Sequence, residues 1–144
     1  VEFFLLASTL NLVVGQRLVR KICKHCKVEV PVTPELASSI RGVLEGVEQS
    51  GLGEISLDGD LKLYEGQGCS KCGNIGYKGR TAIAEVFEIT EDVKRIINKG
   101  AEFDEMKKEA EKQKMLTMQQ DGFIKALSGI TTLSEVIRQT GNMI

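Results

Sequence analysis

Four cysteines constrain the fold of this chain more than any other feature, because they are its only cysteines and form two pairs with the same spacing. Cys23 and Cys26 form the first pair, and Cys69 and Cys72 form the second. Two residues between thiols allow a tight turn, or knuckle, that aims both sulfurs at one metal ion, and two knuckles supply the closed tetrahedral shell of structural zinc. We therefore predict a Zn²⁺ ion that joins the two knuckles and leaves no position open for a catalytic water molecule.

Basic residues and glycines surround both pairs. A zinc ion with four thiolates carries about two negative charges, which nearby cations offset. Glycines let the backbone turn closely around the sulfurs and direct amides towards them. The cations are Arg17, Arg20, Lys21, Lys24 and Lys27 near the first knuckle and Lys71, Lys78 and Arg80 near the second, and the glycines are Gly73, Gly76 and Gly79.

Other interpretations of the cysteines stay open at this point. Rubredoxin-like iron takes the same four thiolates. Disulfides or a redox pair are disfavoured because the chain shows no export signal and a reducing cytosol keeps thiols reduced. His25, the only histidine, could replace a thiolate, although an exposed loop position is the simpler interpretation.

Composition narrows the classes of function. The 144 residues include 19 basic and 20 acidic side chains, and this balance excludes a globally basic nucleic-acid-binding protein, though not a local basic patch. Aromatic residues make up 5% of the chain and tryptophan is absent, which argues against a stacking platform for bases or sugars. The length and a hydrophobic content of 42% indicate one soluble globular domain.

The chain opens on an apolar run from Val1 to Val14. The run is too short to span a membrane, which takes about 20 apolar residues, and it lacks the basic residues that precede a signal core. We predict one helix over residues 3–20, apolar on nearly all sides and therefore buried on nearly all sides. Because a chain of this size seldom surrounds its own terminal helix, we expect it to be a fragment of a longer protein.

Between the knuckles the sequence predicts a helix and a hairpin. The helix starts with Thr33 as its N-cap, has proline at its first position, and should run to about Gln49. Residues 55–57 and 61–64 should form a hairpin around an Asp-Gly turn. After the second knuckle, β-formers predict a strand over residues 80–89.

The remainder of the chain has the helical period. One helix should end at Gly100, a second should cover residues 102–114, and two more should begin at the capping boxes of Thr117 and Thr132. The sequence therefore predicts a mixed, α+β fold that ends in a small helical bundle.

Several segments, taken in order along the chain, resemble the cytoplasmic traffic ATPases of type II secretion and type IV pilus assembly. The matching stretches are Leu5–Asn11, Gln16–Arg20 directly before the first knuckle, Gly76–Thr81 after the second, Asp121–Gly122, and Gly129–Arg138. The chain departs from the family pattern at Gly15, where many relatives have alanine, and at Ala84, where an aromatic residue or histidine is common.

The resemblance implies the C-terminal part of a RecA-like ATPase domain with an inserted four-cysteine zinc-binding subdomain. Residues 1–20 would be a terminal helix of the truncated ATPase core, residues 21–80 the zinc-binding subdomain, and residues 81–144 a strand and the C-terminal helical bundle. The family's phosphate-binding loop, acidic boxes and histidine box lie upstream of the first matched residue. We therefore expect no ATP hydrolysis by this chain alone, with ATP and Mg²⁺ as cofactors of the full-length parent only.

The resemblance also implies partners. The parent would be a homohexamer, cytoplasmic and peripheral at the inner membrane, that meets an inner-membrane platform and cytoplasmic adaptor proteins and no nucleic acid. Arg17, Arg20 and Arg80 are candidates for contacts to a nucleotide or to a neighbouring subunit. The alternatives are a free-standing zinc-ribbon module that binds nucleic acid or protein through its basic first knuckle, and a redox protein that uses either cysteine pair.

Overall fold

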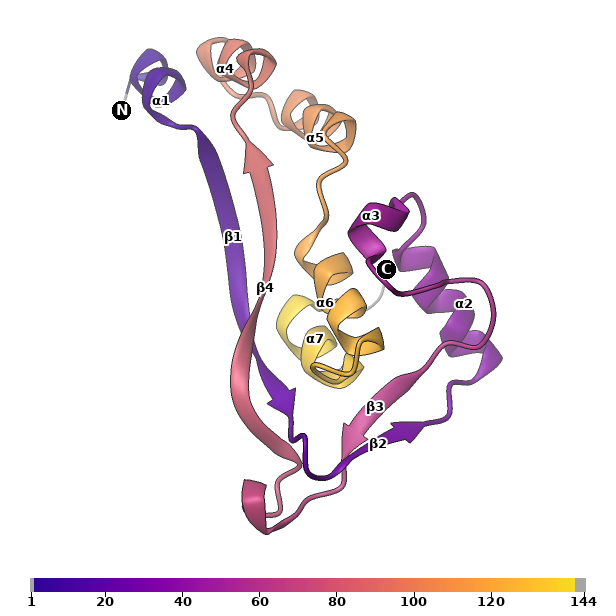
Figure 1. Ribbon diagram of the computed structural model, residues 1–144. Coiled ribbons are helices and arrows are strands. Elements are labelled where there is room, and N and C mark those ends of the chain that lie inside the picture. Colours follow the sequence, from indigo (N-terminus) through magenta and orange to yellow (C-terminus); the bar gives the residue numbers. More distant parts are fainter. Residues whose placement is uncertain (1, 142–144) are drawn as a thin grey trace. The chain divides into compact units, whose positions relative to one another are not determined.

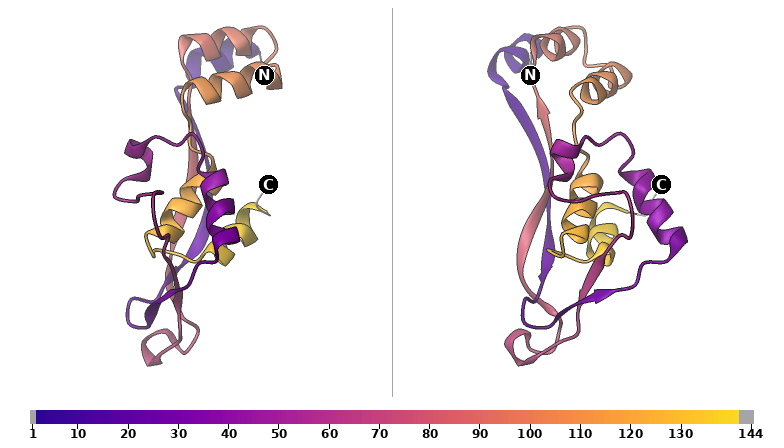
Figure 2. Two further views of the ribbon diagram at one scale, coloured as in Figure 1. Left: turned by 90° about the vertical axis from the view of Figure 1, so that its right-hand side faces the viewer. Right: turned by 45° about the vertical axis from the view of Figure 1, so that its right-hand side comes forward.

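The computed structural model describes residues 2–141 and contains both helices and small sheets, which confirms the mixed fold at that level (Figures 1 and 2). The chain divides into two compact units: unit 1 is Val1–Gly15 with Glu85–Thr117, and unit 2 is Gln16–Ala84 with Met118–Ile144. In chain order the elements are α1 (Phe3–Thr9), β1 (Leu12–Ile22), β2 (Lys27–Val30), α2 (Pro34–Val43), α3 (Gln49–Leu52), β3 (Leu63–Gly66), the short 3-10 helix η1 (Ser70–Cys72), β4 (Tyr77–Glu88), α4 (Glu91–Asn98), α5 (Phe103–Lys112), α6 (Met118–Leu127) and α7 (Leu133–Thr140).

The predicted helix over residues 3–20 is wrong beyond Thr9, because the chain continues as strand β1. β1 contains three valines, whose branched side chains favour a strand over a helix, and it pairs with β4. Backbone hydrogen bonds from Ile89 N to Asn11 O and from Cys23 N to Gly76 O, near opposite ends of the pair, show that the strands run antiparallel.

The predicted burial of this N-terminal stretch is also wrong within the described residues. In α1 only Ala7 is buried, and in β1 only Val19 and Ile22 are buried. Many of the remaining apolar side chains are about half exposed, namely Phe3, Phe4, Leu5, Leu12, Val13, Val14 and Leu18.

Unit 1 is held by a small apolar cluster. α1 lies beside α4, and the buried residues Ala7, Ile89, Val93 and Ile97 form the centre of the cluster (Figure 1). The prediction of α4 is confirmed, since Thr90 caps its first turn by accepting a hydrogen bond from Val93 N at 3.3 Å. The helix predicted over residues 102–114 is confirmed as α5.

Unit 2 has the larger core, which contains Ile40 of α2, Ile83 of β4 and Phe123 of α6, all fully buried. α6 and α7 pack closely because position 122 is glycine: a Cβ there would lie 2.3 Å from Val136 Cγ1. The predicted strand is confirmed as β4, and the last two predicted helices are confirmed as α6 and α7.

The segment between the knuckles differs from its prediction in two places. Thr33 does cap α2, by accepting a hydrogen bond from Leu36 N, but the helix ends at Val43 rather than near Gln49. The predicted hairpin is wrong, because β3 pairs antiparallel with β2, in the register Lys27↔Gly66 to Val30↔Leu63. Residues 55–57 form no strand; Ile55 and Leu57 instead pack as partly buried side chains against the core of unit 2.

Candidate metal centre

The structure brings the four predicted cysteines together. Cys23 directly follows β1 and Cys26 directly precedes β2. Cys69 directly precedes η1, and Cys72 is the last residue of η1. All four cysteines belong to unit 2. Their four Sγ atoms all lie within 4.8 Å of one another. The Sγ atoms are 3.9 Å apart between Cys23 and Cys69, 3.9 Å between Cys26 and Cys72, and 3.7 Å between Cys69 and Cys72. The four cysteines are free thiols and can together hold a metal ion.

The sulfur spacing fits zinc. A tetrahedral ion with Zn–S bonds of about 2.3 Å has sulfur–sulfur edges of about 3.8 Å. The three measured separations, 3.7 Å and twice 3.9 Å, lie close to that edge. The donor set is therefore both chemically and geometrically suited to a four-thiolate site, while His25 is exposed and is not part of the cluster.

Backbone hydrogen bonds hold each knuckle in shape. In the first, Cys26 N donates to Cys23 O at 3.3 Å, and in the second, Cys72 N donates to Cys69 O at 3.1 Å. The Cys69 carbonyl also accepts from Asn74 N at 2.9 Å, across a turn in which Gly73 has a φ of 63°. The predicted role of a glycine in turning the chain behind the sulfurs is borne out at this position.

The backbone crosses itself beside the cluster at two glycines. A Cβ on Gly66 would lie 2.0 Å from the carbonyl oxygen of Gly76, and Gly76 has a φ of 77°. Gly76 in turn accepts the backbone hydrogen bond from Cys23, so this crossing links the two knuckles. Gly66 was not singled out from the sequence, because only the pairing of β3 with β2 brings it against Gly76.

The pKa values of two of the thiols, Cys26 and Cys72, shift in opposite directions. Burial raises the pKa of the Cys26 thiol to about 12, and the neighbouring thiols add to the shift. Burial acts in the same direction on Cys72, but backbone hydrogen bonds from Cys69 and Gly76 outweigh it and lower the pKa of that thiol to about 6. Four thiolates at such short separations repel one another, so full ionisation of the cluster calls for a cation between them.

The chain around the cluster is strongly basic. Residues 11–28 and 66–84 contain eight basic side chains and no acidic one. Four of the eight, Lys24, Lys71, Lys78 and Arg80, are exposed, and their side chains form neither an ion pair nor a hydrogen bond within residues 2–141. Basic residues without acidic ones therefore flank both cysteine pairs in sequence, as predicted, although the net charge of the whole chain is close to zero.

The three candidate arginines lie in different settings. The Arg17 guanidinium donates to the Gln139 carbonyl. Arg20 binds the Glu135 carboxylate, with a shortest N–O distance of 2.5 Å. Arg80 is exposed and lines a shallow hollow together with Arg20 and Tyr77.

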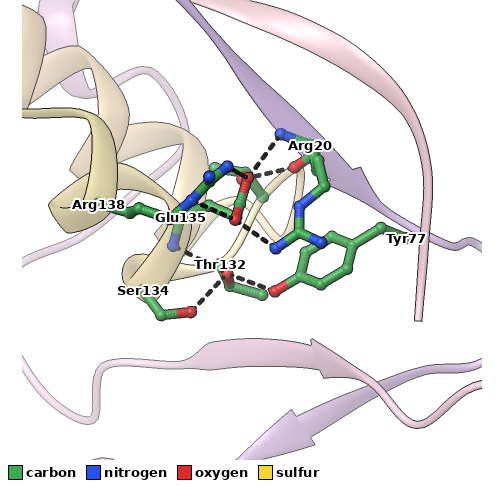
Figure 3. A network of polar contacts seen from close by, with 7 residues as sticks. Arg20, Tyr77, Thr132, Ser134, Glu135 and Arg138 are labelled. Atoms are coloured by element: carbon green, nitrogen blue, oxygen red, sulfur yellow. Dashed lines mark hydrogen bonds and ion pairs between the residues drawn. The ribbon is translucent and has the colours of Figure 1, made fainter. Parts of the chain in front are cut away.

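A buried carboxylate joins the C-terminal helix α7 to the strands (Figure 3). Glu135, 2% exposed, accepts hydrogen bonds from the backbone and side chain of Arg20 and from Arg138. The hydrogen bond from Arg20 is the main reason why the pKa of Glu135 falls to about 2. The capping box predicted at Thr132 has Glu135 as its second member. Thr132 does cap α7, by accepting a hydrogen bond from Glu135 N. The Glu135 carboxylate, however, binds Arg20, which is distant in sequence.

Comparison with known proteins identifies the family. The profile described as "Type II/IV secretion system protein" matches residues 1–138. The chain is 41% identical over 140 residues to the type IV pilus assembly ATPase PilB of Thermus thermophilus, and 39% identical to PilB of Pseudomonas aeruginosa. It is 32% identical to the type II secretion system protein E of Klebsiella pneumoniae. Each match covers 97% of this chain. The chain belongs to the Type II/IV secretion system protein family.

The match covers only part of each relative. The chain spans 14% of the Thermus protein, 23% of the Pseudomonas protein and 25% of the Klebsiella protein. Within residues 2–141, every helix is too short or too polar to cross a membrane.

Proposed function

We propose that this chain is the zinc-binding C-terminal segment of a motor ATPase that powers type II secretion or type IV pilus extension. The observation that carries the proposal is the four-sulfur cluster, whose sulfurs all lie within 4.8 Å of one another and in which three separations, of 3.7–3.9 Å, match the edge of a tetrahedral zinc site. The named relatives support the motor, since their printed names include a pilus assembly ATPase and a type II secretion protein.

Zinc has a structural role in this proposal. The thiolates of Cys23, Cys26, Cys69 and Cys72 occupy all four positions of a tetrahedral ion, so no water molecule is activated. The ion would cross-link the end of β1 to the turn before β4, in the part of the chain that we propose as the zinc-binding subdomain, residues 21–80.

The remainder of the proposal concerns the whole protein. The parent would be a hexamer with a RecA-like core that binds ATP and Mg²⁺, and residues 81–144 would supply a strand and the C-terminal helical bundle. This chain contains no phosphate-binding loop of the form GxxxxGK[ST], so we expect no ATP hydrolysis by this segment alone.

The basic surface around the metal centre supports a docking role. Lys24, Lys71 and Lys78 are exposed and unpaired within residues 2–141, so they suit an acidic surface on an inner-membrane platform or a cytoplasmic adaptor protein. The protein would then be cytoplasmic and peripheral at the inner membrane. Arg80 is the candidate for a nucleotide or subunit contact, because Arg17 and Arg20 are engaged within unit 2.

Metal content tests the proposal. Elemental mass spectrometry on protein purified without added metal should find one zinc per chain, and the paired substitution Cys69→Ser with Cys72→Ser should abolish it. Lys107→Ala with Lys108→Ala, on α5 of unit 1, is the matched control and should keep the zinc. Free thiols without metal in the wild-type chain would refute the site and favour redox chemistry, and iron would indicate a rubredoxin-like centre.

The basic surface also favours one second candidate, a module that binds nucleic acid. A titration with single-stranded DNA at two salt concentrations separates the two functions. Sub-micromolar binding that weakens steeply with salt would support the second candidate. Absence of binding is the result that the motor assignment predicts.

A further inference from the structure

The corner between α6 and α7, residues 129–132, contacts the strands on both sides of the metal centre. Ile22 N donates to Ile130 O at 2.9 Å, and Thr131 Oγ1 donates to the Arg20 carbonyl at 2.7 Å. These bonds hold the last residues of β1, directly before Cys23, against the corner.

The same corner reaches the other strands that lead to the cysteines. Thr132 Oγ1 and the Tyr77 hydroxyl are 3.0 Å apart, and Tyr77 is the first residue of β4. Lys27 Nζ donates to the Gly129 carbonyl at 3.4 Å, and Lys27 directly follows Cys26. Gly129 has a φ of 69°, and a Cβ there would come within 2.9 Å of Tyr64 on β3. The corner therefore contacts all four strands.

Glu135 adds a charged clamp to this arrangement (Figure 3). It binds Arg20 through both the backbone N–H and the guanidinium, and the Arg20 guanidinium lies 4.1 Å from the centre of the Tyr77 ring. β1 and β4 are thus fixed to one another, and to α7, just before the first knuckle and just after the second.

We infer that Glu135 and residues 129–132 position the metal site, so that metal affinity depends on side chains that touch no cysteine. The inference rests on the proposed zinc site. Two knuckles from distant segments bind an ion tightly only if their approach is already fixed, because the ion otherwise has to order them. By linkage, metal binding must in turn stabilise the docking of α7.

A matched control separates positioning from general stability. Asp121 of α6 also joins a C-terminal helix to a strand of unit 2, by accepting a hydrogen bond from Ala84 N at 2.8 Å. Its partner Lys125 donates to the Ala82 carbonyl at 2.8 Å. Neither backbone group is near a cysteine in sequence, so loss of this clamp should weaken unit 2 without changing the metal site.

The experiment titrates Zn²⁺ into the metal-free chain against a chromophoric chelator and records the ligand-field spectrum of the Co²⁺ form. Glu135→Gln should weaken zinc binding by about tenfold or more, in the range seen when outer contacts of metal sites are removed, and should alter the Co²⁺ spectrum. Asp121→Asn should match the wild-type chain in both. Equal affinities for all three chains, or an equal loss in both variants, would overturn the inference, whereas a wild-type chain that binds no zinc would refute the proposed site instead.

Two further measurements keep the test decisive if Glu135→Gln fails to fold. Tyr77→Phe removes only the hydroxyl that contacts Thr132 and should weaken zinc binding by about threefold, the effect of one hydrogen bond. Zinc should also slow hydrogen exchange in residues 133–140 of the wild-type chain and leave α4 in unit 1 unchanged. An unchanged affinity in Tyr77→Phe, or unchanged exchange in α7, would overturn the inference.

Discussion

Different interactions stabilise unit 1 and unit 2, each considered by itself. Unit 2 combines a large apolar core with the four-cysteine cluster and the buried carboxylate of Glu135. Unit 1 has a cluster of four buried residues and exposed ion pairs such as Lys112 with Asp92, and an apolar cleft in it is lined by Phe87, Phe103 and Met106. Polar links between distant segments thus concentrate in unit 2, whereas unit 1 joins its two segments mainly through apolar packing of α1 against α4.

Removal of the metal should give the largest difference between the two units, because it should destabilise unit 2 and leave unit 1 unchanged. At a free zinc concentration at least a thousand times the dissociation constant, removal of the ion should lower the free energy of unfolding of unit 2 by at least about 4 kcal/mol. Hydrogen exchange of the chelated protein should accelerate in β2, β3 and α7 and remain unchanged in α1 and α4. Equal acceleration in both units would show that the ion does not act on unit 2 in particular.

Core truncation should give the next largest difference. Phe123→Ala empties the centre of the unit 2 core and should cost about 3–5 kcal/mol, while Ile97→Ala in the smaller cluster of unit 1 should cost about 2 kcal/mol. Denaturant unfolding of the metal-free chains measures both. A larger loss for Ile97→Ala would reverse the assignment of the stronger core.

Glu135 should give unit 2 a pH dependence in the metal-free chain. Its pKa is about 2 in the folded state against 4.5 as the ordinary value, so its contribution is complete above about pH 4.5 and is lost as the pH falls towards 2. The shift corresponds to at most about 3 kcal/mol. Glu135→Gln should be less stable at pH 7 and should show a flatter decline below pH 4.5; an identical decline in both chains would contradict the assignment.

The exposed ion pairs of unit 1 should contribute least. Lys112 contacts Asp92 at 2.7 Å, and both side chains are largely exposed, so solvent and salt screen the pair. Lys112→Ala should leave the thermal unfolding temperature unchanged within error. A clear decrease that salt removes would show that unit 1 relies on charge more than its structure indicates.

Features encoded within a few residues could be predicted from the sequence. The cysteine spacing identified the cluster, and Thr33 and Thr132 cap helices as predicted. The caps depend on contacts within one turn, and each cysteine pair is a signature of four residues, although the cluster itself joins residues 46 apart.

Features that depend on distant partners could not be predicted. A helix is predicted for residues 12–20 because leucine and arginine favour helices, but pairing with β4 makes this segment a strand. Residues 61–64 read as half of a local hairpin, whereas Leu63 pairs with Val30. The sequence predicts Glu135 only as the capping-box partner of Thr132, because nothing near it in sequence marks Arg20 as its ion-pair partner.

X-ray absorption at the zinc edge of the purified protein tests the central claim most directly. The account predicts four sulfur ligands at about 2.3 Å and no nitrogen or oxygen ligand. Fewer than four sulfurs, or a nitrogen donor such as His25, would contradict the assignment of the site to Cys23, Cys26, Cys69 and Cys72.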